Sequence, residues 1–294
     1  MESVLGQTFG DLECIVVDDG STDDTARLIA SFSDPRVVSA STPHIGVSGA
    51  RNRGLDMSRG DLIAFLDADD RWRPGKLERQ VAILDESPDV DMVFTNFVRF
   101  TAKGKWLPDQ FTYVPELAAT RGEKAAAGGI VLPGDPFDFL VSTGELAAWI
   151  PTIVVRRRVT ESVRFPLGVA ICEDLHYILN IASNSRRLAY LPEPELEVRR
   201  HGENAYEPED VGGNLVSVLR MLEKDPRFAG RASFRFRLGK ELSRQGTRLA
   251  RKGEFRRAAE VLGDALRIRE SRPLAVKAFL AFPLRWLRGV LEWN

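Results

Sequence analysis

The sequence contains few cysteines, and its positive and negative charges nearly cancel. The only cysteines among its 294 residues are Cys14 and Cys172, each in an apolar stretch and without metal-ligand spacing. This argues against a disulfide framework or a zinc site and fits a reducing cytoplasm. Lys and Arg number 41 against 42 Asp and Glu, so the overall balance favours no nucleic acid partner. We therefore expect local sites to decide what the protein binds.

Long apolar runs are missing too. No stretch of about 18 uninterrupted apolar residues occurs, so the sequence predicts no transmembrane helix. The amino terminus also lacks the basic, apolar and small-residue order of a signal peptide. With 44% hydrophobic residues, the chain is long enough for one sizeable domain and a helical appendage, which we expect in the cytoplasm.

The first half alternates short apolar β-branched runs with segments of helical period. This pattern predicts an α/β fold, with a mostly parallel sheet flanked by helices. A helix capped by Ser21 or Thr22 is expected to end at Phe32. Between residues 101 and 134 the periodicity weakens, which indicates a long functional loop. The expected strands are Glu13–Val17, Arg36–Ser39, Leu62–Leu66, Met92–Phe97, Thr152–Val155 and two more before residue 201; further helices are Val47–Ser58 and those beginning at Pro74 and Glu173.

We expect two domains, an α/β domain over residues 1–208 and a helical region over residues 209–294. In an open α/β sheet the opening strand is usually central. Residues 2–9 instead resemble the end of a crossover helix. The sequence therefore predicts that the α/β domain lacks its first strand.

Two acidic clusters follow predicted strands. Asp18 and Asp19 end the first one, where open α/β folds bind ligands; a helix-capping turn explains them equally well. Asp67, Asp69 and Asp70 follow a strand that looks buried on both faces. Oxygen ligands so closely spaced suit Mg²⁺ or Mn²⁺ bound to phosphate, and the cation would relieve their repulsion. The alternative for this cluster is a solvated, Asp-rich loop.

Three further sites are weaker when taken singly. Arg51, in a segment with several glycines, could pair with phosphate oxygens or lie on a helix surface. Glu173 and Asp174 open a helix, where a carboxylate could accept a proton or simply favour the helix dipole. His201 could bind the metal or a phosphate, although an isolated loop histidine usually does neither.

In their order along residues 1–100, these segments resemble the family 2 glycosyltransferases. The matching blocks are Ser3–Thr8, Glu13–Thr25, Ala50–Gly54 and Phe65–Asp70, the last followed by Trp72, Pro74, Lys76 and Leu77. The resemblance implies an inverting enzyme with a Rossmann-like GT-A fold. Members of that family begin with an apolar strand and a nucleotide-holding segment for which this chain has no counterpart.

The resemblance also implies roles for individual residues. Asp18, Asp19, Arg51 and Asp67 would bind the nucleotide sugar, with Asp19 at the base. The cation would be held by Asp67 and Asp69, assisted by Asp70 and His201. Of the pair Glu173 and Asp174, the catalytic base would be Asp174.

The expected reaction moves a sugar from a UDP-, GDP- or dTDP-sugar to a hydroxyl of a glycan or lipid-linked acceptor, with inversion. Cell-surface polysaccharide or glycolipid synthesis would be its setting. Two alternatives remain open: a non-catalytic nucleotide-sugar binder, and a receiver domain with a phosphorylated aspartate, against which the chain's length argues.

The carboxy-terminal region is helical in pattern and rich in Arg, Leu and Ala. Residues 249–266 resemble one tetratricopeptide-type hairpin, which cannot bury its apolar face alone. Residues 274–293 mix aromatic and aliphatic side chains with Lys and Arg. This composition is compatible with peripheral contact with the inner face of a membrane, or with an amphipathic helix packed on the α/β domain.

Overall fold

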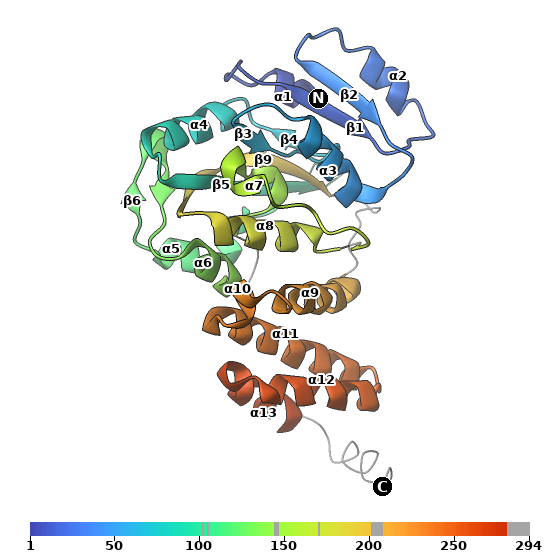
Figure 1. The fold of residues 1–294 in the computed structure, drawn as a ribbon, viewed down its shortest axis with the longest axis vertical. Helices are drawn as coiled ribbons and strands as arrows, with labels where there is room; N and C mark the ends of the chain where they lie inside the picture. The colour runs from blue at the N-terminus through green and yellow to red at the C-terminus, as the bar shows by residue number, and fades with distance from the viewer. Residues whose placement is uncertain (102, 105, 144–146, 170, 201–207, 281–294) are drawn as a thin grey trace. The chain divides into compact units, whose positions relative to one another are not determined.

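The chain folds into two compact units, Met1–Asn204 and Ala205–Asn294. The computed structural model describes residues 1–101, 103–104, 106–143, 147–169, 171–200 and 208–280. Its first unit combines sheets with flanking helices, whereas the described part of the second is helical (Figure 1).

A seven-stranded sheet forms the centre of the first unit. Its order is β3-β8-β5-β9-β7-β6, and β4 pairs with β9. Among its described strands only β5 and β9 are parallel neighbours, and the other pairs are antiparallel. The strands are β3 (Leu62–Ala64), β4 (Arg71–Trp72), β5 (Val90–Thr101), β6 (Glu123–Lys124), β7 (Ile130–Val131), β8 (Val154–Arg156) and β9 (Arg187–Arg200).

This mixed sheet corrects the expectation of a mostly parallel arrangement. A parallel neighbour of β5 would require the chain to cross back to the end of the sheet where β5 begins. Instead β8 starts from the other end and runs antiparallel to β5. The two strands expected before residue 201 are one long strand, β9, whose pairing with β5 is interrupted by bulges near Thr95 and Asn96. The α/β class with carboxy-terminal helices is confirmed.

A second, two-stranded parallel sheet consists of β1 (Cys14–Asp18) and β2 (Val37–Ser41). Among the described residues no strand pairing joins it to the large sheet. Side chains connect it instead, because Glu13 accepts hydrogen bonds from the Arg59 and Gly60 amides at 2.6 and 3.1 Å. The accompanying helices are α1 (Glu2–Leu5), α2 (Thr25–Ala30) and α3 (Gly46–Met57).

The helix α2 is shorter than the sequence suggested. Its amino-terminal cap is Asp24, which corrects the expected cap at Ser21 or Thr22, and it ends before Phe32. No residue of α2 is fully buried, and Leu28 is 62% exposed. Packing therefore contributes little to holding this helix in place.

The core of the first unit forms where the long strands meet the helices. Every residue of β5 from Val90 to Phe97 is buried. The helix α4 (Lys76–Glu86) packs Ile83 and Leu84, both fully buried, against this strand. Burial of each such side chain stabilises the fold by roughly 1.5–3 kcal/mol. Because β8 pairs with both β5 and β3, the strand before Asp67 is tied to this core.

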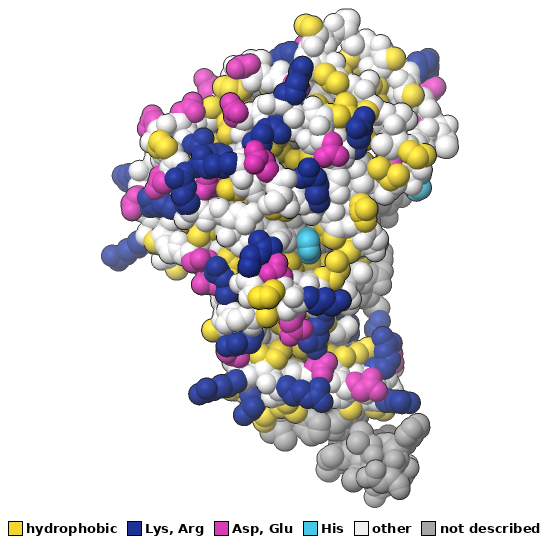
Figure 2. Space-filling view, viewed as in Figure 1, with side chains coloured by type: hydrophobic (Ala, Val, Ile, Leu, Met, Phe, Trp, Pro, Cys, Tyr) yellow, Lys and Arg dark blue, Asp and Glu magenta, His cyan; other side chains and the backbone are white. Residues whose placement is uncertain are grey.

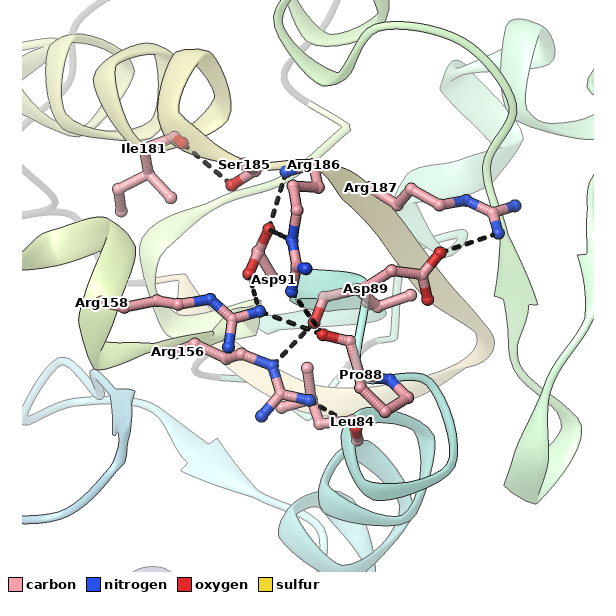
Figure 3. Close-up of polar contacts among 11 residues, drawn as sticks. Leu84, Pro88, Asp89, Asp91, Arg156, Arg158, Ile181, Ser185, Arg186 and Arg187 are labelled. Carbon is pink, nitrogen blue, oxygen red and sulfur yellow. Dashed lines mark hydrogen bonds and ion pairs between the residues drawn. The ribbon is translucent and has the colours of Figure 1, made fainter.

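An arginine cluster lies where the inner strands β8, β5 and β9 of the large sheet begin or end (Figure 3). The Asp91 side chain, 1% exposed, pairs with both Arg158 and Arg186. The Pro88 carbonyl accepts a hydrogen bond from each of these guanidinium groups. Arg156 donates to the Val90 carbonyl at 2.9 Å. The guanidinium groups are thus satisfied by the backbone and one buried carboxylate, and their role is structural.

The segment predicted as a loop contains short elements. Asn96 on β5 anchors it by donating to Asp109 at 2.8 Å and accepting from the Phe111 amide at 3.1 Å. Its elements are the 3₁₀ turns η1 (Gln110–Tyr113) and η2 (Ala126–Gly128), the helix α5 (Pro115–Ala119) and strands β6 and β7. The chain continues through α6 (Pro136–Ser142), η3 (Ile150–Thr152), α7 (Arg157–Thr160) and α8 (Glu173–Asn184).

The second unit is built around its longest described helix, α11 (Ala232–Arg251), which packs against α9, α12 and α13. A Cβ at Gly246 would lie 2.5 Å from the Leu262 side chain, so glycine permits the close approach of α11 and α12. No described helix of the chain is long and apolar enough to cross a membrane. The other elements are α9 (Pro208–Glu223), α10 (Pro226–Ala229), α12 (Phe255–Arg267), η4 (Arg269–Ser271) and α13 (Arg272–Leu280).

Candidate active site

Arg51 brings two of the predicted sites together. It lies on α3, and its two terminal nitrogens donate to Glu173 and to Asp67 at 2.8 Å each. Its side chain is 14% exposed. Burial opposes the positive charge, but the two carboxylates outweigh this effect and raise the pKa of Arg51. Residues 122 positions apart in the sequence thus share one ion-pair network.

The acidic pair opening α8 lies in the interior. Glu173 is 3% and Asp174 is 6% exposed. One Glu173 oxygen pairs with Arg51, while the other, Oε2, has no hydrogen-bond partner among the described residues. Burial, followed by the neighbouring Glu173 carboxylate, raises the pKa of Asp174 to about 6. The two carboxylates therefore differ: one is paired with a cation, and the other is poised to exchange a proton near neutral pH.

The residue before this pair has an unusual backbone. Cys172 has a φ of 69°, in the left-handed region that residues with a Cβ rarely adopt. Such conformations cost about 1–3 kcal/mol and persist only where the surrounding structure imposes them. This strained residue lies at the start of α8, directly before Glu173 and Asp174.

The second acidic cluster follows β3, which ends at Ala64 and is shorter than predicted. Asp70 is buried and accepts a hydrogen bond from the Arg199 amide at 3.1 Å. Burial and the carboxylates of Asp69 and Asp67 raise the pKa of Asp70 to about 7. The three aspartates therefore lie close enough to repel one another.

This crowding fits a divalent cation. Within the described part of the chain, no three His, Cys, Asp or Glu side chains are grouped so that they alone could hold a metal ion. Carboxylate oxygens at Asp67 and Asp69 are suitable ligands for Mg²⁺ or Mn²⁺, which bind few protein groups and take the others from water or phosphate. His201, the other predicted ligand, lies outside the described residues.

Asp18 and Asp19 have local partners. Asp18 accepts a hydrogen bond from the Ser21 amide at 3.0 Å. Asp19 accepts from the Thr42 hydroxyl and from the Ile45 and Gly46 amides, each at 2.7 Å. Although burial acts the other way, these hydrogen bonds lower the pKa of Asp19. Asp19 therefore fixes the loop after β1 to the start of α3, the helix that carries Arg51.

The structure does not bring all predicted residues into contact. No hydrogen bond or ion pair joins Asp18 or Asp19 to Arg51, Asp67 or Glu173 in the residues described. The two groups are connected through α3, which Asp19 holds at one end and whose Arg51 reaches the other acidic residues.

Aromatic side chains that sequence reasoning missed support the network. The Phe165 and Tyr177 rings stack at 3.9 Å, and the Arg51 guanidinium lies 5.3 Å from the Phe165 ring centre. Asn52, next to Arg51, exchanges two hydrogen bonds with the Phe165 backbone, at 3.0 and 2.9 Å. The apolar Phe165 had no motif around it, so only its position in space shows its role.

Comparisons with known proteins agree with this geometry. The family model for glycosyl transferase family 2 matches residues 1–136. A UDP-Glc:alpha-D-GlcNAc-diphosphoundecaprenol beta-1,3-glucosyltransferase of Escherichia coli is 35% identical over 118 residues, 40% of this chain and 46% of the relative. An uncharacterized glycosyltransferase of Nostoc sp. is 34% identical over 172 residues, 57% of this chain and 48% of the relative. The chain thus spans about half the length of these relatives.

Solved structures show the same fold. The crystal structure of S. aureus TarS residues 1–349 in complex with UDP-GlcNAc has a TM-score of 0.65 and 20% identity, and the match covers 95% of this chain and 82% of that one. The fold, the order of the acidic motifs and the family model agree with one another. Over residues 1–136 this chain is similar to glycosyltransferase family 2.

Proposed function

We propose that the protein transfers a sugar from a nucleotide-sugar donor to an acceptor hydroxyl, with inversion at the anomeric carbon and with help from a divalent cation. The observation that carries the proposal is the network in which Arg51 binds both Asp67 and Glu173. It joins the residues assigned to the donor and those assigned to proton transfer. A helix-capping role for each motif would not require this convergence.

The donor site is assigned to the segments around Asp19 and Asp67. TarS was crystallised with UDP-GlcNAc, and the Escherichia coli relative is named for a UDP-Glc donor. These names support a nucleotide sugar here, with UDP the first nucleotide to test. Asp67 and Asp69 would hold the cation beside the diphosphate, where it supplies positive charge that stabilises the leaving group.

The base is assigned to Asp174. Glu173 is already paired with Arg51, whereas burial leaves Asp174 with a pKa of about 6. A base must be deprotonated at the working pH yet basic enough to accept a proton, and a pKa near neutrality satisfies both conditions. In the proposed step Asp174 takes the proton of the acceptor hydroxyl, whose oxygen bonds to the anomeric carbon as the bond to the nucleoside diphosphate breaks.

The acceptor is proposed to be a glycan or lipid-linked sugar of cell-surface polysaccharide or glycolipid synthesis. Support comes from the Escherichia coli relative, whose name includes a diphosphoundecaprenol-linked sugar. An acceptor of this type is anchored in a membrane, so the enzyme would work at a membrane surface. The predicted contact through residues 274–293 stays a prediction, because residues 281–294 lie outside those described.

Two substitutions test the assignment. Asp69→Ala should abolish transfer from UDP-sugars in the presence of Mn²⁺, since the cation loses a ligand. Asp174→Asn should reduce turnover by at least 100-fold while donor binding, measured by calorimetry, stays within about twofold. Glu86→Gln, an exposed carboxylate on α4, is the matched control. Donor binding without transfer in the unsubstituted protein would instead support the non-catalytic binder.

A further inference from the structure

The overall charge of −1 conceals two units of opposite charge. Residues 205–294 contain 19 Lys and Arg against 11 Asp and Glu, a net charge of +8. Residues 1–204 contain 22 against 31, a net charge of −9. An anionic surface would therefore attract the helical unit and repel the catalytic one.

The positive charge is concentrated at the turn between α11 and α12, here called the basic tip (residues 248–257). Gly253 has a φ of 80°, and the Glu254 amide donates to the Leu249 carbonyl at 2.9 Å, so the turn is tight. All residues from 251 to 257 except Glu254 are exposed. The cations of the tip are Arg248, Arg251, Lys252, Arg256 and Arg257.

Few carboxylates offset these cations. Glu254 is the only acidic residue of the tip, and it pairs with Arg257. Glu260, one turn further along α12, lies 3.4 Å from Arg256 in a pair whose side chains are 76% and 65% exposed. Such an exposed pair contributes little and is readily exchanged for another anion. The tip therefore keeps a positive surplus.

The basic tip also contains an exposed aromatic side chain. Phe255, the first residue of α12, is 38% exposed and is flanked in sequence by Glu254 and Arg256. Lys and Arg beside an exposed aromatic ring suit the boundary of a lipid bilayer, where cations bind headgroup phosphates and the ring enters the apolar layer. Figure 2 shows Lys and Arg side chains at the right-hand ends of α11 and α12.

We propose that the basic tip binds the surface of an anionic lipid bilayer. The choice of a bilayer over another polyanion rests on the lipid-linked acceptor proposed above. The surface itself is defined by the turn, the cations and Phe255, and it lies on a different unit from the donor site. Binding through the tip would hold the enzyme where its acceptor is anchored.

The test is sedimentation of the full chain with vesicles, without donor. Vesicles of phosphatidylcholine alone are compared with vesicles of equal parts phosphatidylcholine and phosphatidylglycerol. Each cation near such a surface strengthens binding by roughly fivefold. The variant R251Q/K252Q/R256Q should therefore partition on the order of 100-fold more weakly to the anionic vesicles. High salt should likewise weaken the binding of the unsubstituted protein to the anionic vesicles.

A control separates the tip from the charge of the whole unit. The variant R267Q/R269Q/K277Q removes the same charge elsewhere on the unit, and it should retain most of the binding. Phe255→Ser should weaken binding at high as well as low salt. Equal losses in the tip and control variants, equal binding to both kinds of vesicle, or binding to short duplex DNA but not to vesicles would each overturn the proposal.

The outcome is independent of catalysis. Vesicle binding needs no donor, and transfer to a water-soluble acceptor should be the same in the tip variant and in the unsubstituted protein. If the protein binds vesicles but transfers no sugar, the proposed function fails and the proposal for the basic tip holds. If it transfers sugar but does not bind vesicles, only the proposal for the basic tip fails.

Discussion

Replacement of Arg51 by methionine tests whether the bridge between Asp67 and Glu173 holds the site together. Methionine keeps much of the side chain's apolar volume but removes both ion pairs. Glu173, 4% exposed, would then be a buried carboxylate without its cation. Breaking a buried pair in this way costs about 3–5 kcal/mol. Asp67, at 28% exposed, adds less because water can solvate it. We expect the free energy of unfolding to fall by about 3 kcal/mol.

Two companion variants isolate the cause. Arg51→Lys keeps the charge but cannot donate to two carboxylates in the same geometry, so an intermediate loss of about 1–2 kcal/mol is expected. In Arg51→Met/Glu173→Gln the unpaired charge is gone, and part of the lost stability should return. Urea unfolding in the absence of donor, followed by tryptophan fluorescence, measures all four proteins. A loss below about 1 kcal/mol for Arg51→Met, or no recovery in the double variant, would refute the reasoning.

Further measurements address the other carboxylates. The transfer rate at saturating donor should rise with pH through about 6, because Asp174 accepts a proton only after losing its own; Asp174→Asn should remove this rise. Asp91→Ala should lower the free energy of unfolding by about 1–2 kcal/mol, because the Arg186 amide loses its acceptor while water can solvate the half-exposed guanidinium groups of Arg158 and Arg186. Glu86→Gln should change it by less than about 0.5 kcal/mol in the same urea experiment. Asp70, whose pKa is raised from 3.8 to about 7, holds a proton in the folded state that the unfolded chain releases. Its contribution to stability therefore falls as pH rises from about 4 to about 7. In thermal unfolding with EDTA at those two pH values, the unsubstituted protein should lose more stability than Asp70→Asn, in which only other groups such as Asp174 respond; an equal change in both proteins would contradict this.

Local patterns were sufficient to predict the elements that carry the motifs. The apolar runs before Asp18 and Asp67 are strands, and α8 begins at Glu173 as expected. Each of these signals lies within a few residues of the side chain that it positions. For this reason α/β class and motif placement were readable from a single sequence.

Long-range pairings were not readable in this way. Nothing near Arg51 in the sequence identifies Glu173 as its partner, because the contact depends on where the fold places the start of α8 relative to α3. The antiparallel β8 was missed because hydrophobic runs reveal strands but not their direction. Asp19 was assigned to the nucleotide, and its bonds to the Ile45 and Gly46 amides became visible only in three dimensions.

The low stability of the small parallel sheet of β1 and β2 makes it sensitive to ligand binding. Two paired strands with little buried surface are barely stable alone, and β2 contains no buried residue. Amide hydrogens there should exchange with solvent sooner than those of β5. A molecule that contacts both the β1–β2 sheet and the aspartates after β3 would stabilise this sheet. Its binding would be detected as slower amide hydrogen exchange in residues 14–41.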